Sequence, residues 1–483
     1  MLFRSFATSF VAGAAVLELQ RNPSLPPAQV AANLVSSATT GALTVARGSP
    51  NRLLYLQQVA APVTGIDGLN AYPAAVRMVD TRPTTTGTNY KGALELGDEA
   101  TPLASGTVRR YPLVGVRDIP EDATVVLNVI AVAPQGGGNL VVWPCATVGS
   151  ARPAANWLNY SPGATVANSG VVGIGPEGGI CVAASGTTDL IIDVVGWIPP
   201  GDTVSPMRPP VRLLDTRPTT NGSTARGALE VTVDEATPFT AGAVRRYVVA
   251  GVGGLPASGA RSVALNVTST LAVTSGALRV YPCDDVSTTA PAARTMMFTQ
   301  GVTVAAGAVV PLSDGGAFCV ASTGTTDVVL DVTAWFASGA GYATFAAPYQ
   351  PVRLLDTRSG EMGSLEGVDR TVPLAAQTTG GTEFVIAGSG GLPSASVMRA
   401  AALTITVYSP TGSGYLRVWR CASGSSTAPT SSVLNFRTGV STSNLVVASV
   451  DNTAGTAGGV CVQTSRTVHL SIDVSGWFLR SPP

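Results

Sequence analysis

The sequence predicts an all-β protein: three tandem antiparallel β-sandwich domains, jelly-roll-like, each with one disulfide, after a mostly irregular N-terminal segment. Three observations support this. A string close to "VRLLDTR" occurs three times, each copy is followed by a closing string such as "LDVTAWF", and the six cysteines fall two to a copy. The copies recur about every 138 residues, far above the repeat length of solenoids and propeller blades, which indicates whole domains in series.

Composition supports the fold class and argues against some partners. The 483 residues include 54 Gly and 34 Pro, and together with abundant Val and Thr they are typical of short strands joined by tight turns. Apolar residues make up 45%, which is enough for a core in every domain. Charged residues make up only 12%, with a net charge of zero and no basic cluster, so nucleic acid is not expected as a partner.

The N-terminal segment, residues 1–71, matches no copy of the repeat. It begins "MLFRSFATSFVAGAAVLELQ", which resembles a secretory signal, although Thr8 and Ser9 interrupt its apolar run. This run is too short to span a membrane. Further on, "LPPAQVAANLV" predicts a short helix with proline in its first turn. The apolar strings "FVAGAAVL" and "RLLYLQQVAAPV" of this segment predict an assembly anchor, buried against copies of itself or against other subunits.

The repeated strings fix the predicted domains. The aspartates of the first string are Asp80, Asp215 and Asp356, and the tryptophans of the closing string are Trp197, Trp335 and Trp477. The domains are therefore expected at 72–199, 207–337 and 348–480, with eight to ten short strands each. The first and last strands of a domain are expected to pair, which would close each domain on its own ends.

The middle of each domain predicts a hairpin. In the second copy it reads "VALNVTSTLAVTSGALRVYPC", a strand, a glycine turn and a second strand. The connector at 199–210 is rich in proline and is expected to be stiff. Together with the connector at 337–351, it favours a rod of three separate domains over a compact group.

The Asp-Thr-Arg motif predicts a structural ion pair. Because side chains alternate along a strand, Asp215 and Arg217 would lie on one face, and arginine matches a carboxylate with two donors. The same pairing is expected for Asp80 with Arg82 and for Asp356 with Arg358. The alternative is a carboxylate used for binding or chemistry in every domain. The third copy replaces "PTT" after the motif with "SGE", which a structural strand tolerates more easily than a ligand loop does.

The cysteines predict one disulfide in each domain, because the count is even and their positions repeat. The pairs are Cys145 with Cys181, Cys283 with Cys319, and Cys421 with Cys461. Buried free thiols are the alternative, and zinc would lack two of its usual four ligands. Disulfides indicate an oxidising location: the cell surface, the medium or a virion.

Few residues in the sequence indicate a catalytic, metal-binding or ligand-binding site. Trp143, Tyr281 and Trp419, each two residues before the first cysteine of a copy, are candidate glycan contacts, with core packing as the alternative. The one histidine, His469, has no counterpart in the other copies, and no metalloprotease motif is present. We therefore predict no catalytic residue, no metal site and no cofactor.

The strings "VRLLDTR", "LRVYPC", "GAFCVAS" and "TDVVLDVTAWF" resemble the "LDTR…GW(F)" β-domain repeats of actinobacteria. The resemblance covers about 76–480. It implies secreted, cell-wall-associated or phage surface proteins, in which the repeat itself has no catalytic role. The second copy departs from the other two where they carry Asn159, Asn168, Asn435 and Asn444, so any role of these residues is not shared by all copies.

The sequence thus predicts a non-catalytic structural or adhesive component of an extracellular assembly. The most concrete version is a tail, fibre or decoration protein of an actinobacterial phage virion. The alternative is a secreted bacterial adhesin or cell-wall-binding protein whose repeats bind host-surface or wall glycan.

Overall fold

The structure is a computed structural model. It describes Val11, Ala15 and residues 26–37, 39–40, 52–53, 68–83, 92–94, 101–200, 204–218, 227–229, 237–337, 345–346, 350–361, 363–365, 372–421, 427–450 and 458–479. The chain divides into two compact units, Met1–Ile66 and Asp67–Pro483.

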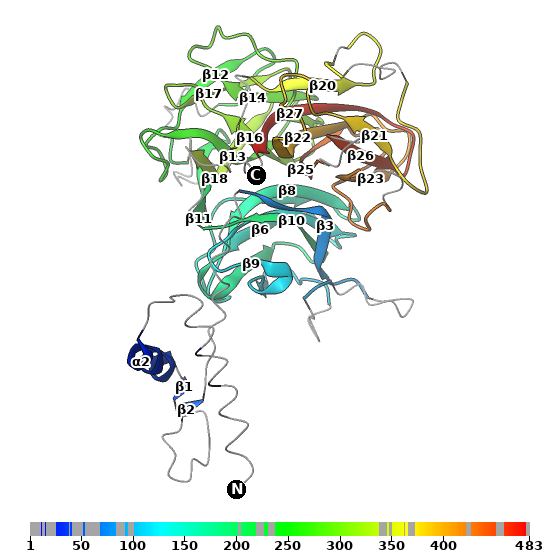
Figure 1. The fold of residues 1–483 in the computed structure, drawn as a ribbon. Coiled ribbons are helices and arrows are strands. Elements are labelled where there is room, and N and C mark those ends of the chain that lie inside the picture. The colour runs from blue at the N-terminus through cyan, green and yellow to red at the C-terminus, as the bar shows by residue number, and fades with distance from the viewer. Residues whose placement is uncertain are drawn as a thin grey trace. The chain divides into compact units, whose positions relative to one another are not determined.

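The first unit contains the predicted helix. Helix α2 (Pro27–Ser37) begins with proline, as expected, and the Gln29 side chain donates a hydrogen bond to Asn33 one turn later, at 2.9 Å (Figure 1). Strands β1 (Thr39–Thr40) and β2 (Arg52–Leu53) pair antiparallel. Most of the predicted anchor lies outside the described residues: of "FVAGAAVL" only Val11 and Ala15 are described, and residues 54–67 are not.

The second unit confirms the all-β class. Repeat 1 comprises β3 (Asn70–Asp80), β4 (Val108–Pro112), β5 (Thr124–Val132), β6 (Gly138–Pro144), β7 (Leu158–Tyr160), β8 (Val166–Gly173), β9 (Gly179–Ala184) and β10 (Asp189–Ile198). Repeat 2 comprises β11 (Val204–Asp215), β12 (Val244–Val248), β13 (Ala260–Thr270), β14 (Gly276–Pro282), β15 (Met296–Phe298), β16 (Val304–Pro311), β17 (Ala317–Ser322) and β18 (Asp327–Ala337). Repeat 3 comprises β19 (Phe345–Ala346), β20 (Val352–Asp356), β21 (Thr382–Val385), β22 (Met398–Tyr408), β23 (Gly414–Arg420), β24 (Leu434–Phe436), β25 (Thr442–Ser449), β26 (Gly459–Thr464) and β27 (His469–Leu479).

Each repeat forms two sheets whose strands interleave along the chain. Repeat 1 has the orders β3-β10-β5-β8 and β4-β9-β6-β7, and the described strands of the other two repeats follow the same plan. The predicted pairing of the first and last strands is confirmed, because Asp80 lies opposite Ile191, Asp215 opposite Val329, and Asp356 opposite Ser471. In each repeat, the sheet that contains this pair is called the inner sheet below.

The predicted hairpin is wrong. Strands β5 and β6 follow one another in sequence but belong to different sheets, because both edges of β5 are already bonded to β10 and β8. The chain crosses to the other sheet through a residue with positive φ that is not glycine. This residue is Ala133 (42°) in repeat 1, Leu271 (50°) in repeat 2 and Ser409 (36°) in repeat 3.

The inner sheets are buried on both faces. In β13, Val263, Leu265 and Val267 face a core that includes residues from both sheets of repeat 2. Between them, Ala264 faces a second core at the centre of the unit, shared with Val126 of repeat 1 and Ala402 of repeat 3. The inner sheets of all three repeats therefore pack against one another.

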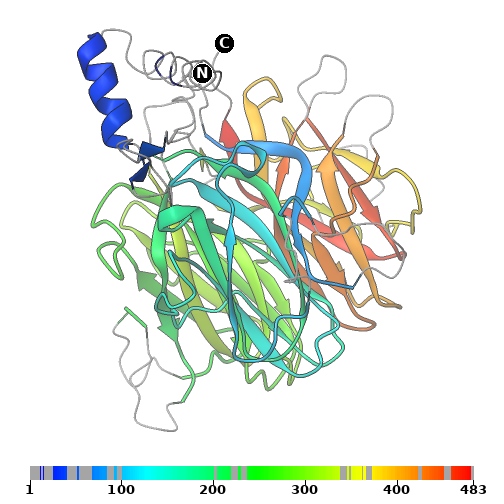
Figure 2. The same cartoon turned by 90° about the horizontal axis from the view of Figure 1, so that it is seen from below.

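The prediction of a rod of three sandwiches in series is wrong for this reason. The three repeats lie side by side in one compact unit (Figures 1 and 2). Residues 204–210 of the predicted connector belong to strand β11 rather than to a free spacer. The six sheets have the arrangement of a six-bladed propeller, in which the three inner sheets line the central core, although each sheet takes its strands from distant parts of a repeat rather than from consecutive ones.

Candidate functional site

The Asp-Thr-Arg motif ends the first strand of each repeat and folds back on its own carboxylate. Asp215 is 4% exposed, and Arg217 donates to it from Nε at 2.8 Å and from Nη2 at 2.5 Å. The backbone N–H of Arg217 donates to the same carboxylate at 3.2 Å. Asp80 with Arg82, and Asp356 with Arg358, make the same contacts. The ion pairs form, but in a turn after the strand rather than on one strand face.

Sequence reasoning missed two further members of each cluster. Arg212, on β11, donates from Nε to Asp331 at 2.8 Å and from Nη1 to Asp215 at 3.2 Å. The same roles belong to Arg77 and Asp193 in repeat 1 and to Arg353 and Asp473 in repeat 3. The "VR" before the motif and the "DV" in the closing string recur in every copy and were the available signal. Each repeat therefore holds two arginines and two aspartates of balanced charge.

The closing-strand carboxylates are almost completely buried. Asp193 and Asp331 are 0% exposed and Asp473 is 2% exposed. Burial raises the pKa of all three carboxyls, while the arginine beside each one favours the charged form. A carboxylate in this position is stabilised only if its remaining lone pairs also find donors.

The neighbouring repeat supplies such a donor to two of the three carboxylates. The backbone N–H of Asn156, in repeat 1, donates to Asp331 of repeat 2 at 2.9 Å, and that of Arg294, in repeat 2, donates to Asp473 of repeat 3 at 2.9 Å. At the remaining junction, the Asn128 amide of repeat 1 donates to the Ser432 carbonyl of repeat 3 at 2.6 Å. Each repeat thus bonds to the other two, repeat 1 with 2, 2 with 3 and 3 with 1.

Buried asparagines complete the contact at the centre. Asn168 is 1% exposed and its Oδ1 accepts the backbone N–H of Gly307, in repeat 2, at 2.7 Å. Asn444 is 0% exposed and accepts the backbone N–H of Ser169, in repeat 1, at 3.0 Å. A Cβ at position 307 would lie 1.8 Å from the Ser169 carbonyl oxygen, so this approach requires glycine. Repeat 2, the copy that lacks these asparagines, contributes Gly307 to this contact.

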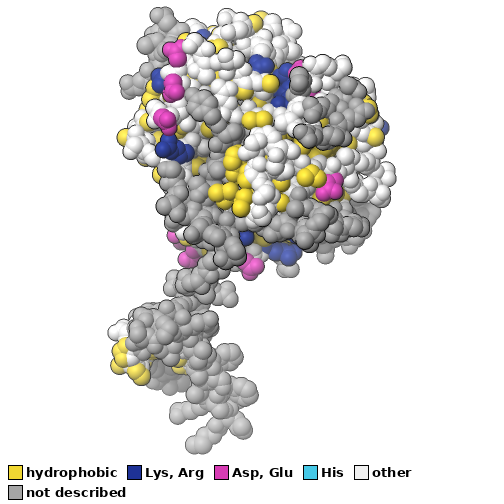
Figure 3. Space-filling model, turned by 45° about the horizontal axis from the view of Figure 1, so that its top comes forward, with side chains coloured by type: hydrophobic (Ala, Val, Ile, Leu, Met, Phe, Trp, Pro, Cys, Tyr) yellow, Lys and Arg dark blue, Asp and Glu magenta, His cyan; other side chains and the backbone are white. Residues whose placement is uncertain are grey.

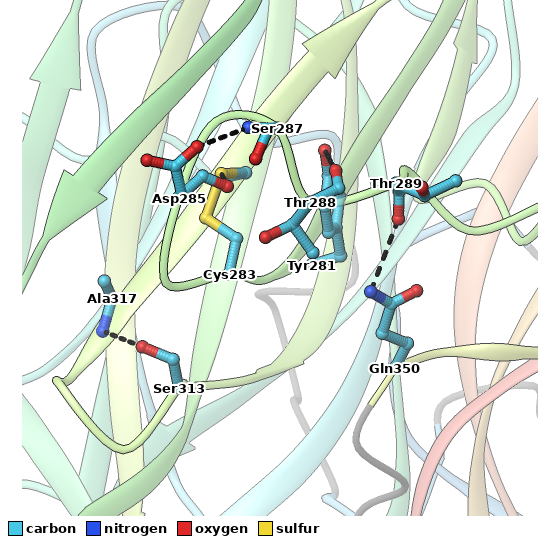
Figure 4. Close-up of a disulfide and its surroundings, with 10 residues drawn as sticks. Tyr281, Cys283, Asp285, Ser287, Thr288, Thr289, Ser313, Ala317 and Gln350 are labelled. Carbon is cyan, nitrogen blue, oxygen red and sulfur yellow. Dashed lines mark hydrogen bonds between the residues drawn. A yellow bond between two sulfur atoms is a disulfide. The ribbon is translucent and has the colours of Figure 1, made fainter.

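The three predicted disulfides are present, each within one repeat. Figure 4 shows the one between Cys283 and Cys319 beneath the loop that follows Cys283. In that loop the Thr289 carbonyl accepts a hydrogen bond from Gln350 at the start of repeat 3, at 3.3 Å.

The three candidate glycan-binding aromatics lie beside these disulfides. Trp143 is 1% exposed, Tyr281 is 0% exposed and Trp419 is 4% exposed. The Tyr281 hydroxyl donates to the Thr288 carbonyl at 3.2 Å. None of the three presents a ring face to solvent on which a sugar could stack. Their position agrees with the alternative expectation, which was packing in the core.

The contacts of repeat 3 give a reason for the replacement of "PTT" by "SGE" after its motif. Arg294 stands where the other junctions have Asn156 and Ser432, and so brings an extra positive charge to the 2–3 junction. Its Nη1 donates to the Tyr408 hydroxyl at 2.8 Å. Glu361, from the "SGE" string, lies 3.2 Å from Arg358, 3.5 Å from Arg294 and 3.7 Å from Arg353. The added glutamate therefore offsets the added arginine.

The described part of the chain contains few other candidates for a catalytic or metal-binding site. His469 Nδ1 lies 3.0 Å from the Thr357 carbonyl oxygen and 3.2 Å from its hydroxyl, so it belongs to the strand pairing beside the motif. No group of three or more His, Cys, Asp or Glu that could hold a metal occurs among the described residues. No described helix is long and apolar enough to cross a membrane.

Comparison with known proteins gives short or distant similarities. No protein-family model matches the chain. The alkaline serine exoprotease A of Vibrio alginolyticus is 57% identical over 51 residues, which are 11% of this chain and 10% of that protein, so the chain matches only a tenth of its length.

Solved structures cover more of the chain. The triple-jelly-roll turret protein of an archaeal virus has a TM-score of 0.18 at 6% identity, over 85% of this chain and 90% of that one. The tandem CBM22 domain of Paenibacillus barcinonensis Xyn10C has a TM-score of 0.16 at 12% identity, over 56% and 93%. At these TM-scores neither similarity carries an argument about fold or function.

Proposed function

We propose that the chain is a non-catalytic structural component of an extracellular assembly, most concretely a tail, fibre or decoration protein of an actinobacterial phage. One observation carries the proposal: the buried charged clusters are used to join the three repeats into a closed unit. Their arginines, aspartates and asparagines bond to one another and to neighbouring backbone. A disulfide in each repeat adds resistance to unfolding in an oxidising setting.

Within this proposal each repeat is a jelly roll. If the strands of repeat 1 are numbered one to eight, the two sheets have the orders 1-8-3-6 and 2-7-4-5, as in interlocked Greek keys. The surface of the unit fits a building block. The face in Figure 3 shows few charged side chains among its coloured residues, and a low charge favours packing against neighbouring subunits.

The test compares the full chain with residues 67–483, the second compact unit. We expect the full chain to associate through its N-terminal segment and residues 67–483 to remain a folded monomer, as measured by light scattering and circular dichroism. Identical oligomeric states for the two proteins would contradict the anchor. Saturable binding of soluble wall glycan by residues 67–483 would instead favour a surface adhesin.

A further inference from the structure

The three junctions between repeats differ at one hydrogen bond. It involves the inner-strand residue that lies opposite the closing-strand aspartate, which is Asn128 on β5, Asn266 on β13 and Thr404 on β22. Asn266 donates to the Asn156 carbonyl of repeat 1 at 2.8 Å, and Asn128 donates to the Ser432 carbonyl of repeat 3 at 2.6 Å. An asparagine amide therefore links the repeats at two junctions, and the 2–3 junction has a threonine in its place.

The threonine does not make the equivalent hydrogen bond. The carbonyl that corresponds to those of Asn156 and Ser432 belongs to Arg294. The hydroxyl of threonine ends one atom nearer the backbone than the amide of asparagine, and no hydrogen bond between described residues involves the Thr404 hydroxyl or the Arg294 carbonyl. Thr404 is only 6% exposed. Because a buried hydroxyl without a partner carries a desolvation cost, a partner from outside the chain would stabilise it.

A second side chain is also shorter at this junction. At the 1–2 junction, Asn168 donates to the Asn266 side-chain oxygen at 2.9 Å. Asn168 is the third residue of β8, and the third residue of β16 is Ala306. Repeat 2 therefore has no amide at this position with which to reach Thr404, and two shortened side chains face each other between repeats 2 and 3.

A cavity lies at this place. Its lining includes Arg294 and Thr295 of repeat 2 and Thr404 and Asp473 of repeat 3. Its volume is ≈ 10 Å³, which is about the room that one water molecule needs. The two groups that lack the asparagine bond thus belong to residues on the wall of a space that fits a single small polar molecule.

We propose that one water molecule binds in this cavity and joins the Thr404 hydroxyl to the Arg294 carbonyl, in the role that the asparagine amide has at the other two junctions. A buried water needs about two to four polar partners, and the Asp473 carboxylate offers a third. A cation of similar size would meet a site without excess negative charge, because Arg353 pairs with Asp473 at 2.7 Å and the Arg294 guanidinium lies at the same junction. The water site goes beyond the assembly role proposed above and does not rest on it.

A crystal structure of the intact chain, at a resolution that places ordered water, tests the occupant. We expect one water at about 2.7–3.2 Å from both the Thr404 Oγ1 and the Arg294 carbonyl oxygen. Crystals soaked in rubidium chloride should show no anomalous peak there, since rubidium would replace a bound monovalent cation but not water. An empty cavity, or a rubidium peak inside it, would overturn the proposal.

A matched pair of variants tests the site in solution. Thr404→Val removes the hydroxyl with little change of shape and should lower the folding equilibrium constant about fivefold in urea denaturation, because the water loses a partner. The control is Thr268→Val on β13. Thr268 is 3% exposed and its hydroxyl is buried without a partner, so its removal should not lower stability. If the cavity is dry, the two hydroxyls are alike, and equal effects of the two substitutions would reject the water.

A third variant tests the equivalence of water and amide. Thr404→Asn copies Asn266 and Asn128, so its amide should displace the water and donate directly to the Arg294 carbonyl. Its crystal structure should show the Nδ2 atom within hydrogen-bonding distance of that oxygen and no water between them. A water that stays bound to the Arg294 carbonyl in this variant would contradict the proposed role.

Discussion

At the residue scale, each repeat contains a cluster of two arginines and two aspartates whose carboxylates are buried. Asp215 accepts hydrogen bonds from Arg212 and Arg217 and is almost completely buried. Removing its charge leaves Arg212, which is 10% exposed, with excess positive charge. The asymmetry between forming a buried pair and breaking it makes these positions sensitive to conservative change.

We therefore expect Asp215→Asn to lower the free energy of unfolding of the intact chain by about 3–5 kcal/mol, as measured by urea denaturation. The matched control is Asp314→Asn. Asp314 also pairs with an arginine, Arg261, but it is 98% exposed, so its loss should change stability by less than about 0.5 kcal/mol. Equal effects of the two substitutions would contradict the structural role of the motif.

Tyr72 makes stability depend on alkaline pH. Its hydroxyl donates to the Arg117 carbonyl at 2.6 Å, and burial and the nearby Asp118 charge raise its pKa from 10.0 to about 12. The folded state holds this proton more tightly than the unfolded state does. The contribution to stability is therefore complete below pH 10 and is lost as the pH rises towards about 12.

The measurement is the free energy of unfolding at pH 7, 9 and 11 for the wild type and Tyr72→Phe. The variant should lose about 1 kcal/mol or less at neutral pH, because it lacks one hydrogen bond. The difference between the two proteins should shrink at pH 11. A constant difference over the whole range would show that the Tyr72 proton is not linked to folding.

At the element scale, the inner strands explain where sequence reasoning succeeded and failed. Strands, disulfides and the pairing of first with last strand were predictable, because repeated motifs mark them. The crossing after β5 was not, because a glycine-rich segment between two apolar runs is typical of a hairpin. In β13 the alternate residues Ala264, Asn266 and Thr268 are small or polar, so the face that packs against other repeats resembles a solvent-facing one.

Close approach between two strands gives a test at this scale. We expect Gly307→Ala to cost about 1–3 kcal/mol or more, because its Cβ would overlap the Ser169 carbonyl oxygen of repeat 1. Gly136→Ala is the control, since a Cβ there meets nothing within 4 Å. Equal melting temperatures for the two variants would mean that the β8–β16 contact is looser than described.

At the scale of the whole molecule, the partners of each cluster explain why the arrangement could not be predicted. Arg212 and Asp331 are far apart in the chain, and the third donor to Asp331 comes from another repeat. Nothing in one copy of the motif indicates that it needs a neighbour. Self-contained domains were therefore expected from the repeat length and the paired cysteines, whereas the structure shows three repeats that complete one another.

It follows that the repeats should not fold independently. We expect residues 67–483 to unfold in a single transition in denaturant, with fluorescence and circular dichroism coinciding. Residues 67–337, which lack repeat 3, should lose cooperativity or associate, because Val126, Ala264 and Val309 would become exposed at the former centre. A shortened protein that unfolds in the same way as residues 67–483 would restore the description as separate domains.

The contact between repeat 3 and the start of repeat 1 has a topological consequence. Arg399 donates to the Leu69 carbonyl at 3.0 Å, and the adjacent Met398 lies opposite Leu479 on the last strand. The two ends of the second unit thus meet beside one short segment of β22. Joining them with a few residues and opening the chain between β10 and β11 would give a circular permutant with the same junctions in a new order along the sequence. The fold therefore depends more on the order of the repeats around the centre than on their order along the chain.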